Sequence, residues 1–105
     1  MENLDDTFAA LAHGARRTIL KELRSGEKSL SELAGSFDMS QTAVSKHVRI
    51  LNEAGLVRVE QRGRTRFCQL NDDPMQTARQ WITDYEAFWQ NQFENLARHL
   101  AKDGL

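Results

Sequence analysis

The chain has 105 residues, 40% of them hydrophobic and 28% charged, with a formal net charge of -1. This length predicts one domain with a modest hydrophobic core. Pairing with a second subunit would stabilise so small a domain. The sequence shows no apolar run long enough to span a bilayer and no basic-plus-apolar leader that would mark export, so we expect a cytoplasmic protein. The single cysteine, Cys68, excludes an internal disulfide and a cage of thiolate ligands.

The N-terminal quarter of the sequence predicts two short helices. The first is amphipathic and ends near His13 and Gly14. The second runs through "ARRTILKELRSG", with Gly26 just past its end. The apolar residues that recur at helical spacing are Leu4, Phe8 and Leu11 in the first helix and Ile19, Leu20 and Leu23 in the second.

Two further helices follow, each with a polar cap at its start. Ser29 and Glu32 have the spacing of a capping box and predict a short third helix that stops around residues 35–37. Ser40 is the N-cap candidate of a fourth helix, which stops at Gly55. A short helix followed closely by a longer one is the arrangement of a helix-turn-helix.

The fourth helix has two contrasting faces when its residues are placed at ~100° intervals. One face is apolar apart from His47, which we expect to be a core histidine bonded to backbone rather than a metal ligand. The other face is polar, and its side chains can bond to base edges and phosphates. An ordinary surface helix is the alternative. The DNA-binding candidates on this helix are Ser40, Gln41, Thr42, Ser45, Lys46 and Arg49.

A β-hairpin is predicted next, because "LVRVEQ" and "RTRFCQL" are typical strand segments and Gly63 supplies the positive φ of a tight turn. Arg62, Arg64 and Arg66 lie at or beside this turn, where no core packing explains them. We therefore add these three arginines to the DNA-binding candidates. Residues 41–70 hold six of the 14 basic residues but two of the 15 acidic ones, so a basic patch stands on an acidic body.

A long helix closes the chain, with Asp73 as N-cap, Pro74 at its first position and an end near Lys102. Five of the eight aromatic residues lie on it within thirteen positions, at steps of three and four. One small domain cannot cover such a stripe along ~42 Å of helix, which favours dimerisation over an aromatic-lined small-molecule pocket. The predicted interface residues are Leu4, Phe8, Leu11, Trp81, Ile82, Tyr85, Phe88, Trp89, Phe93 and Leu96.

"LAHGARRTILKEL", "LSELAGSFDMSQTAVSKHVRILNEAGLV" and "RGRTRFCQL" together are similar to ArsR-type bacterial transcriptional repressors, over about residues 8–71. The resemblance implies a homodimer on a palindromic operator, with the fourth helix in the major groove and the hairpin as wing. We expect a mainly α (α+β) winged helix-turn-helix in the order α-α-α-α-β-β-α. One domain would span residues 1–105, with a DNA-binding core at about 14–71 and dimerisation by about 2–12 and 74–102.

Metal sensing, a known activity of this family, is not predicted for this chain. The thiolate pair of the family would fall near Glu32, where the sequence has no cysteine. On the last helix Asp84, Glu86 and His99 lack the spacing of a ligand set. Instead, "WITDYEAFW" resembles a subgroup without recognised metal ligands. Cys68 is either a single redox switch or a small core residue.

We therefore predict a homodimeric, sequence-specific DNA-binding repressor, with double-stranded DNA and a second copy of itself as partners. No membrane partner, metal or cofactor is expected, and the sequence identifies no small-molecule effector. The alternatives are a winged helix that binds only protein, and a repressor that senses redox state or a small molecule. No nucleophile and base, phosphate loop or carboxylate pair stands at useful spacing, so no catalytic site is predicted.

Overall fold

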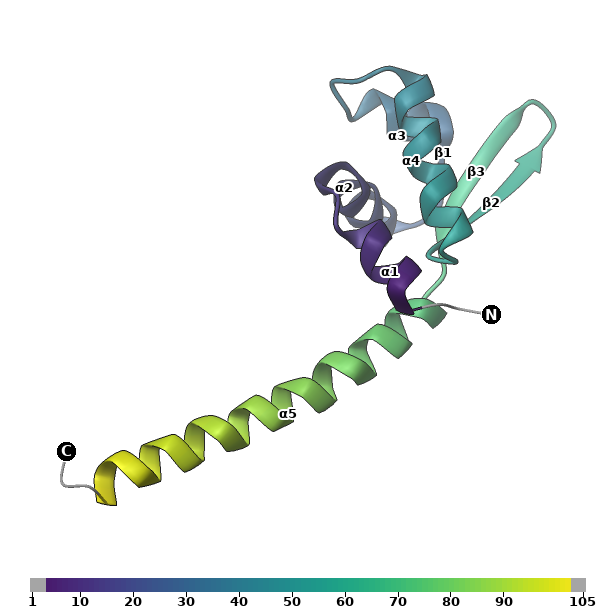
Figure 1. The fold of residues 1–105 in the computed structure, drawn as a ribbon. Helices are drawn as coiled ribbons and strands as arrows, with labels where there is room; N and C mark the ends of the chain where they lie inside the picture. The colour runs from purple at the N-terminus through teal and green to yellow at the C-terminus, as the bar shows by residue number, and fades with distance from the viewer. Residues whose placement is uncertain (1–3, 103–105) are drawn as a thin grey trace.

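The computed structural model describes residues 4–102, so positions 2 and 3 of the predicted dimerisation segment lie outside the described residues. The small sheet lies to one side of helices that form the body with it, and the last helix extends away from this body (Figure 1). The helical elements are α1 (Leu4–Leu11), α2 (Gly14–Glu22), the 3-10 turn η1 (Leu23–Ser25), α3 (Leu30–Gly35), α4 (Gln41–Glu53) and α5 (Asp73–Lys102). The strands are β1 (Lys28–Ser29), β2 (Val57–Arg62) and β3 (Thr65–Leu70).

The helix ends follow from local hydrogen bonds that the sequence predicts. At α3, the Ser29 hydroxyl accepts from the Glu32 N–H at 3.1 Å and the Glu32 carboxylate accepts from the Ser29 N–H at 3.0 Å, which confirms the capping box. Ser40 caps α4 by accepting from the Ala43 N–H at 3.1 Å. Gly55, with φ of 79°, ends α4 in the left-handed conformation that glycine adopts without strain.

The sheet has three antiparallel strands in the order β1-β3-β2, whereas the sequence predicted only the β2–β3 hairpin. The expected element order was wrong in omitting β1. This strand is two residues long, Lys28 opposite Cys68 and Ser29 opposite Phe67. So short a segment has no alternation of its own, and its pairing with β3 is decided by how η1 and α3 pack.

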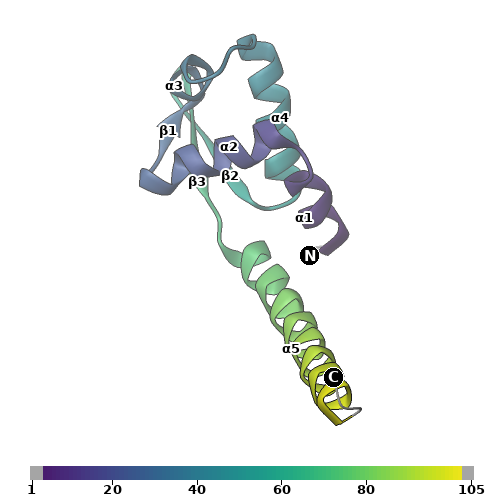
Figure 2. The same cartoon turned by 90° about the vertical axis from the view of Figure 1, so that its left-hand side faces the viewer.

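The core lies between α1–α4 and one face of the sheet. Figure 2 shows these helices and the sheet together at one end of the molecule. Apolar residues at helical spacing supply it from each helix, as the periodicity of the sequence predicts. Its buried residues are Ala10, Ile19, Leu23, Leu33, Val44, Val48, Leu51, Ala54, Leu56, Val57 and Cys68.

The last helix meets the body only through its first turns. The carbonyl of Asp72, just before α5, accepts from the Gln76 N–H at 3.0 Å. The helix therefore starts at Asp73, one residue before the predicted first position, Pro74. Pro74 and Ala78 are buried, and every residue described after Ala78 is exposed. The molecule is consequently elongated, with extents of 70 × 31 × 22 Å. In the described part of the chain, no helix combines the length and apolar character that crossing a membrane requires.

Candidate DNA-binding surface

The fourth helix is held to the body by one face and presents the other to solvent. Val44, Val48 and Leu51 are buried on the inner face. Exposed on the outer face are Gln41, Thr42, Lys46 and Arg49, with Ser45 half-buried beside them. The first turn of this outer face is polar and uncovered, as the predicted reading helix of a helix-turn-helix requires.

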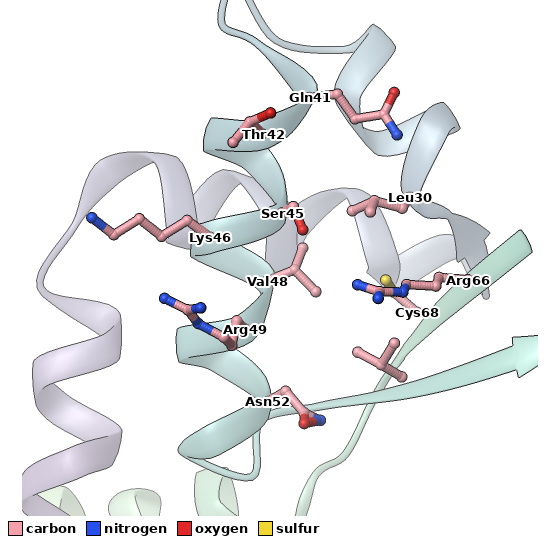
Figure 3. A pocket seen from close by; sticks show the side chains of 11 residues that line it. Leu30, Gln41, Thr42, Ser45, Lys46, Val48, Arg49, Asn52, Arg66 and Cys68 are labelled. Atoms are coloured by element: carbon pink, nitrogen blue, oxygen red, sulfur yellow. The ribbon is translucent and has the colours of Figure 1, made fainter.

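A groove of about 780 Å³ separates α4 from the β2–β3 hairpin. Figure 3 shows Arg66 reaching across from β3 toward Val48 and Arg49 of α4. Apolar side chains, including Leu30 and Val48, line the groove behind the polar ones. From the predicted DNA-binding set the structure brings together here Gln41, Thr42, Ser45, Lys46, Arg49 and Arg66.

The hairpin turn projects beyond the body and continues this groove. Gly63 and Arg64 form the two-residue loop, with φ of 61° at Gly63 and negative φ at Arg64, which is the pattern of a type II′ turn. Arg64 and Arg66 line a second hollow together with Gln61 and Gln41. Gln61, which also accepts from the Arg66 guanidinium at 3.3 Å, was missing from the predicted set.

Arg62 is not brought to this surface, because strand residues alternate between the two faces of the sheet. The Arg62 guanidinium lies 4.6 Å from the centre of the Phe67 ring on the opposite face. It donates two hydrogen bonds of 2.8 Å to the Glu27 carboxylate and one of 2.9 Å to Glu60. The hydrogen bond from Arg62 and its positive charge lower the pKa of Glu60.

His47 departs from its predicted environment. It is half-buried rather than core, and its Nδ1 lies 3.3 Å from an Arg16 guanidinium nitrogen instead of bonding to backbone. Arg16 also donates to the Ala10 carbonyl at 2.7 Å, so it links the end of α1 to α4. Burial lowers the pKa of His47, and the charges of His13, Arg16 and Lys46 lower it further. The helical wheel located the correct face but not the depth of the ring.

Cys68 is fully buried in the core beneath the groove. Burial raises the pKa of its thiol, although Arg66 opposes this shift. Because the thiolate is the reactive form, this environment favours the small core residue over the redox switch. Asp84 and Glu86 are exposed on α5, and within the described residues no three metal-ligating side chains stand close enough to hold an ion.

A second surface, on α5 and α1, is apolar. The larger apolar side chains of α5 from Trp81 to Leu100 are between 41% and 59% exposed. The Trp81 ring packs edge-on against Phe8 of α1, with ring centres 5.8 Å apart. Leu4 and Leu11 on α1 are half-buried. The α5 side chains form an open stripe rather than an enclosed pocket, which favours a protein partner over a small ligand.

Comparison with known proteins identifies the family. A family model described as "Bacterial regulatory protein, arsR family" matches residues 13–59. Over 100 residues the chain is 33% identical to the HTH-type transcriptional regulator Rv2034 of Mycobacterium tuberculosis, covering 95% of this chain and 91% of that one. The chain belongs to the arsR family. The members of this family are transcriptional regulators, not enzymes.

Solved structures agree with the family assignment. The crystal structure of another ArsR-family transcriptional regulator superposes with a TM-score of 0.78 at 33% identity, over 83% of this chain and 96% of that one. A homodimeric winged helix-turn-helix DNA-binding domain from Mycobacterium bovis, described as a possible ArsR-family regulator, has a TM-score of 0.64 at 26% identity, over 76% and 77%. These matches confirm the predicted winged helix-turn-helix, in which the hairpin is the wing.

Proposed function

We propose that this arsR-family chain is a homodimeric, sequence-specific repressor that binds a palindromic operator. The observation that carries this proposal is the groove between α4 and the wing, where the polar outer face of α4 and Arg66 converge. The groove continues to Arg64 at the wing tip. Such a surface offers bases hydrogen-bonding groups and offers phosphates positive charge, while the rest of the chain is acidic.

Each residue of this surface has a distinct role in the proposal. Gln41, Thr42, Ser45 and Lys46 approach base edges in the major groove. Arg49, Arg64 and Arg66 contact phosphates or the neighbouring minor groove. Ser40 keeps the first turn of α4 in place by its cap and lies where a helix N-terminus favours a phosphate.

Dimerisation is proposed to cover the apolar stripe of α5 and the adjoining face of α1. The DNA-binding core would then be about residues 14–71, with segments 2–12 and 74–102 forming the dimer contact. Two-fold symmetry orients two α4 helices toward half-sites roughly 34 Å apart. The homodimeric Mycobacterium bovis domain supports this arrangement. A dimer bound in this way blocks access to the DNA that it covers, and we place its action in the cytoplasm.

Fluorescence anisotropy with the DNA upstream of the protein's own gene tests the proposal. We expect salt-sensitive binding with a Kd below the micromolar range. Arg64→Ala should weaken binding to any sequence and reduce the slope of log K against log salt by about one unit. Arg79→Ala removes the same charge from α5, far from the groove, and should leave the slope unchanged. If the protein shows no salt-sensitive binding in the micromolar range, the chain acts instead as a protein-binding winged helix.

A further inference from the structure

The wing is attached to the body on the face opposite the proposed DNA groove. The Arg62 side chain leaves the end of β2, passes over the Phe67 ring of β3 and reaches Glu27, which directly precedes β1. It therefore links the end of β2, over β3, to the residue that precedes β1, in a sheet whose strand order is β1-β3-β2. A residue near the wing tip is thus bonded to a segment 35 residues away in sequence.

The geometry of this contact fixes a direction as well as a distance. Both terminal nitrogens of Arg62 donate to Glu27, one to each carboxylate oxygen and each at 2.8 Å. Such parallel bonds between two planar groups restrict their relative orientation, which a single bond does not. β1 pairs with β3 only as far as Phe67, so the part of the wing nearer the turn extends past the ladder that joins it to the body. The Arg62–Glu27 pair is a further link between that part of the wing and the body.

We propose that Arg62 is a positioning residue: through Glu27 it holds the wing at the angle from which Arg64 and Arg66 reach DNA. This inference rests on the DNA-binding function proposed above. It reassigns Arg62 from DNA contact to control of the wing. Arg62 also neutralises two carboxylates, Glu27 and Glu60, that would otherwise repel phosphates beside the wing.

Glu60 provides a matched control for Glu27. Both carboxylates bond to the same guanidinium, but Glu60 stands two residues from Arg62 on the same strand. Glu27→Gln and Glu60→Gln therefore remove equal charge from the same site, and only the first weakens the link between the wing and the body. An exposed ion pair contributes little to global stability, so both variants should remain folded.

The experiment measures operator affinity against salt concentration for both variants, and hydrogen exchange of the wing amides in the DNA-free protein. We expect Glu27→Gln to weaken binding roughly five-fold, because a loosened wing must be ordered on binding. Its wing amides should also exchange faster. Glu60→Gln should change affinity less than about two-fold and leave exchange unaltered. Arg62→Ala should weaken binding while lowering the salt slope far less than the unit expected for a phosphate contact.

Three results would overturn the inference. Equal effects of Glu27→Gln and Glu60→Gln would show that only charge matters. Tighter binding by Glu27→Gln would show that Glu27 competes with DNA for Arg62. A loss of about one unit of salt slope in Arg62→Ala would make Arg62 a phosphate contact. If the unsubstituted protein binds no DNA, the proposed function itself fails, whereas these three results concern Arg62 alone.

Discussion

The fourth and fifth helices are both amphipathic, but the molecule treats them in opposite ways. The inner face of α4 is buried, with Val44 and Leu51 completely covered by the body. The apolar face of α5 is uncovered, with Trp89 42% exposed and Phe93 59% exposed. What α4 leaves to solvent is a row of hydrogen-bonding groups, and what α5 leaves to solvent is a row of aromatic rings.

This difference indicates which kind of partner each helix meets. A helix whose apolar face is buried and whose exposed face is polar suits a partner with a charged, hydrated surface, such as DNA. A helix whose apolar face is exposed along most of its length suits a partner with a complementary apolar face, in an interface that excludes water. A second copy of the same chain provides that face by symmetry. Substitutions on α4 and on α5 should therefore affect dimerisation, stability and DNA binding differently.

The largest effect is expected from a charge on the α5 stripe. Trp89→Glu removes a large aromatic contact and places a carboxylate in each half of the proposed interface. Because the change occurs twice in a symmetric dimer, we expect dissociation to be favoured by about 4 kcal/mol or more, roughly a thousand-fold. Sedimentation velocity over a range of concentrations should show a monomer. DNA affinity should fall as the dimer dissociates.

Ala87→Glu is the control for this prediction. It adds the same charge on the opposite side of α5, where Ala87 is exposed, and the dimer should persist. If both variants remain dimeric, or if both dissociate, the aromatic stripe is not the interface.

The second effect compares leucines on the two helices. Leu51 on α4 is fully buried, while Leu96 on α5 is 53% exposed. In the monomeric Trp89→Glu background, Leu51→Ala should lower the free energy of unfolding by about 2–5 kcal/mol, because it leaves a cavity in the core. Leu96→Ala should change it by less than about 0.5 kcal/mol. Urea denaturation measures both, and a comparable loss from Leu96→Ala would mean that α5 folds back onto the body.

Most of this fold could be predicted from the sequence because the residues that begin and end its elements act locally. The Ser29–Glu32 capping box, the glycine after α4 and the glycine in the wing each act through bonds to nearby backbone, and all three confirm the expected elements. β1 was not predictable in this way. Its two residues become a strand only because β3 passes beside them.

The candidate site was predictable in part. The helical wheel placed the outer face of α4 correctly, yet it could not tell a half-buried His47 from a core one. For the wing, a two-residue turn sets Gln61 opposite Arg66 and Arg62 opposite Thr65. Strand alternation then separates Arg62 from Arg66, and this signal was present in the sequence. Glu27, the partner of Arg62, is too distant along the chain for local patterns to reveal.

The third effect concerns how each helix starts. The first turn of α5 is held by the burial of Pro74, whereas the first turn of α4, with Gln41 and Thr42, is exposed and depends on the Ser40 cap. Ser40→Ala should therefore cost about 1 kcal/mol in unfolding free energy and weaken DNA binding several-fold by fraying that turn. Thr83→Ala, which removes a hydroxyl from an exposed position inside α5, away from the groove, is the control. Equal stability of the two variants would mean that the cap does not hold α4.

The smallest effect is a pH dependence of how α4 is attached to the body. The Arg16 guanidinium can donate to His47 Nδ1 only while that nitrogen is unprotonated, and protonation would set two cations side by side. Burial and the neighbouring charges of His13, Arg16 and Lys46 accordingly lower the pKa of His47 from its ordinary value of 6.5. Between that value and the lowered pKa, the unfolded chain binds more protons at this position than the folded chain does. Stability is thus unaffected above pH 6.5 and falls as the pH drops toward the folded pKa.

His47→Gln tests this dependence, because glutamine keeps an acceptor for Arg16 and does not titrate. Urea denaturation between pH 7 and pH 5 should show a steeper loss of stability in the unsubstituted protein than in the variant. The two proteins differ only at position 47, so the difference between the two curves reports His47 alone. Parallel curves would mean that the link between α1 and α4 does not depend on the neutral imidazole. In that case the attachment of α4 rests on its apolar face, as its contrast with α5 would suggest.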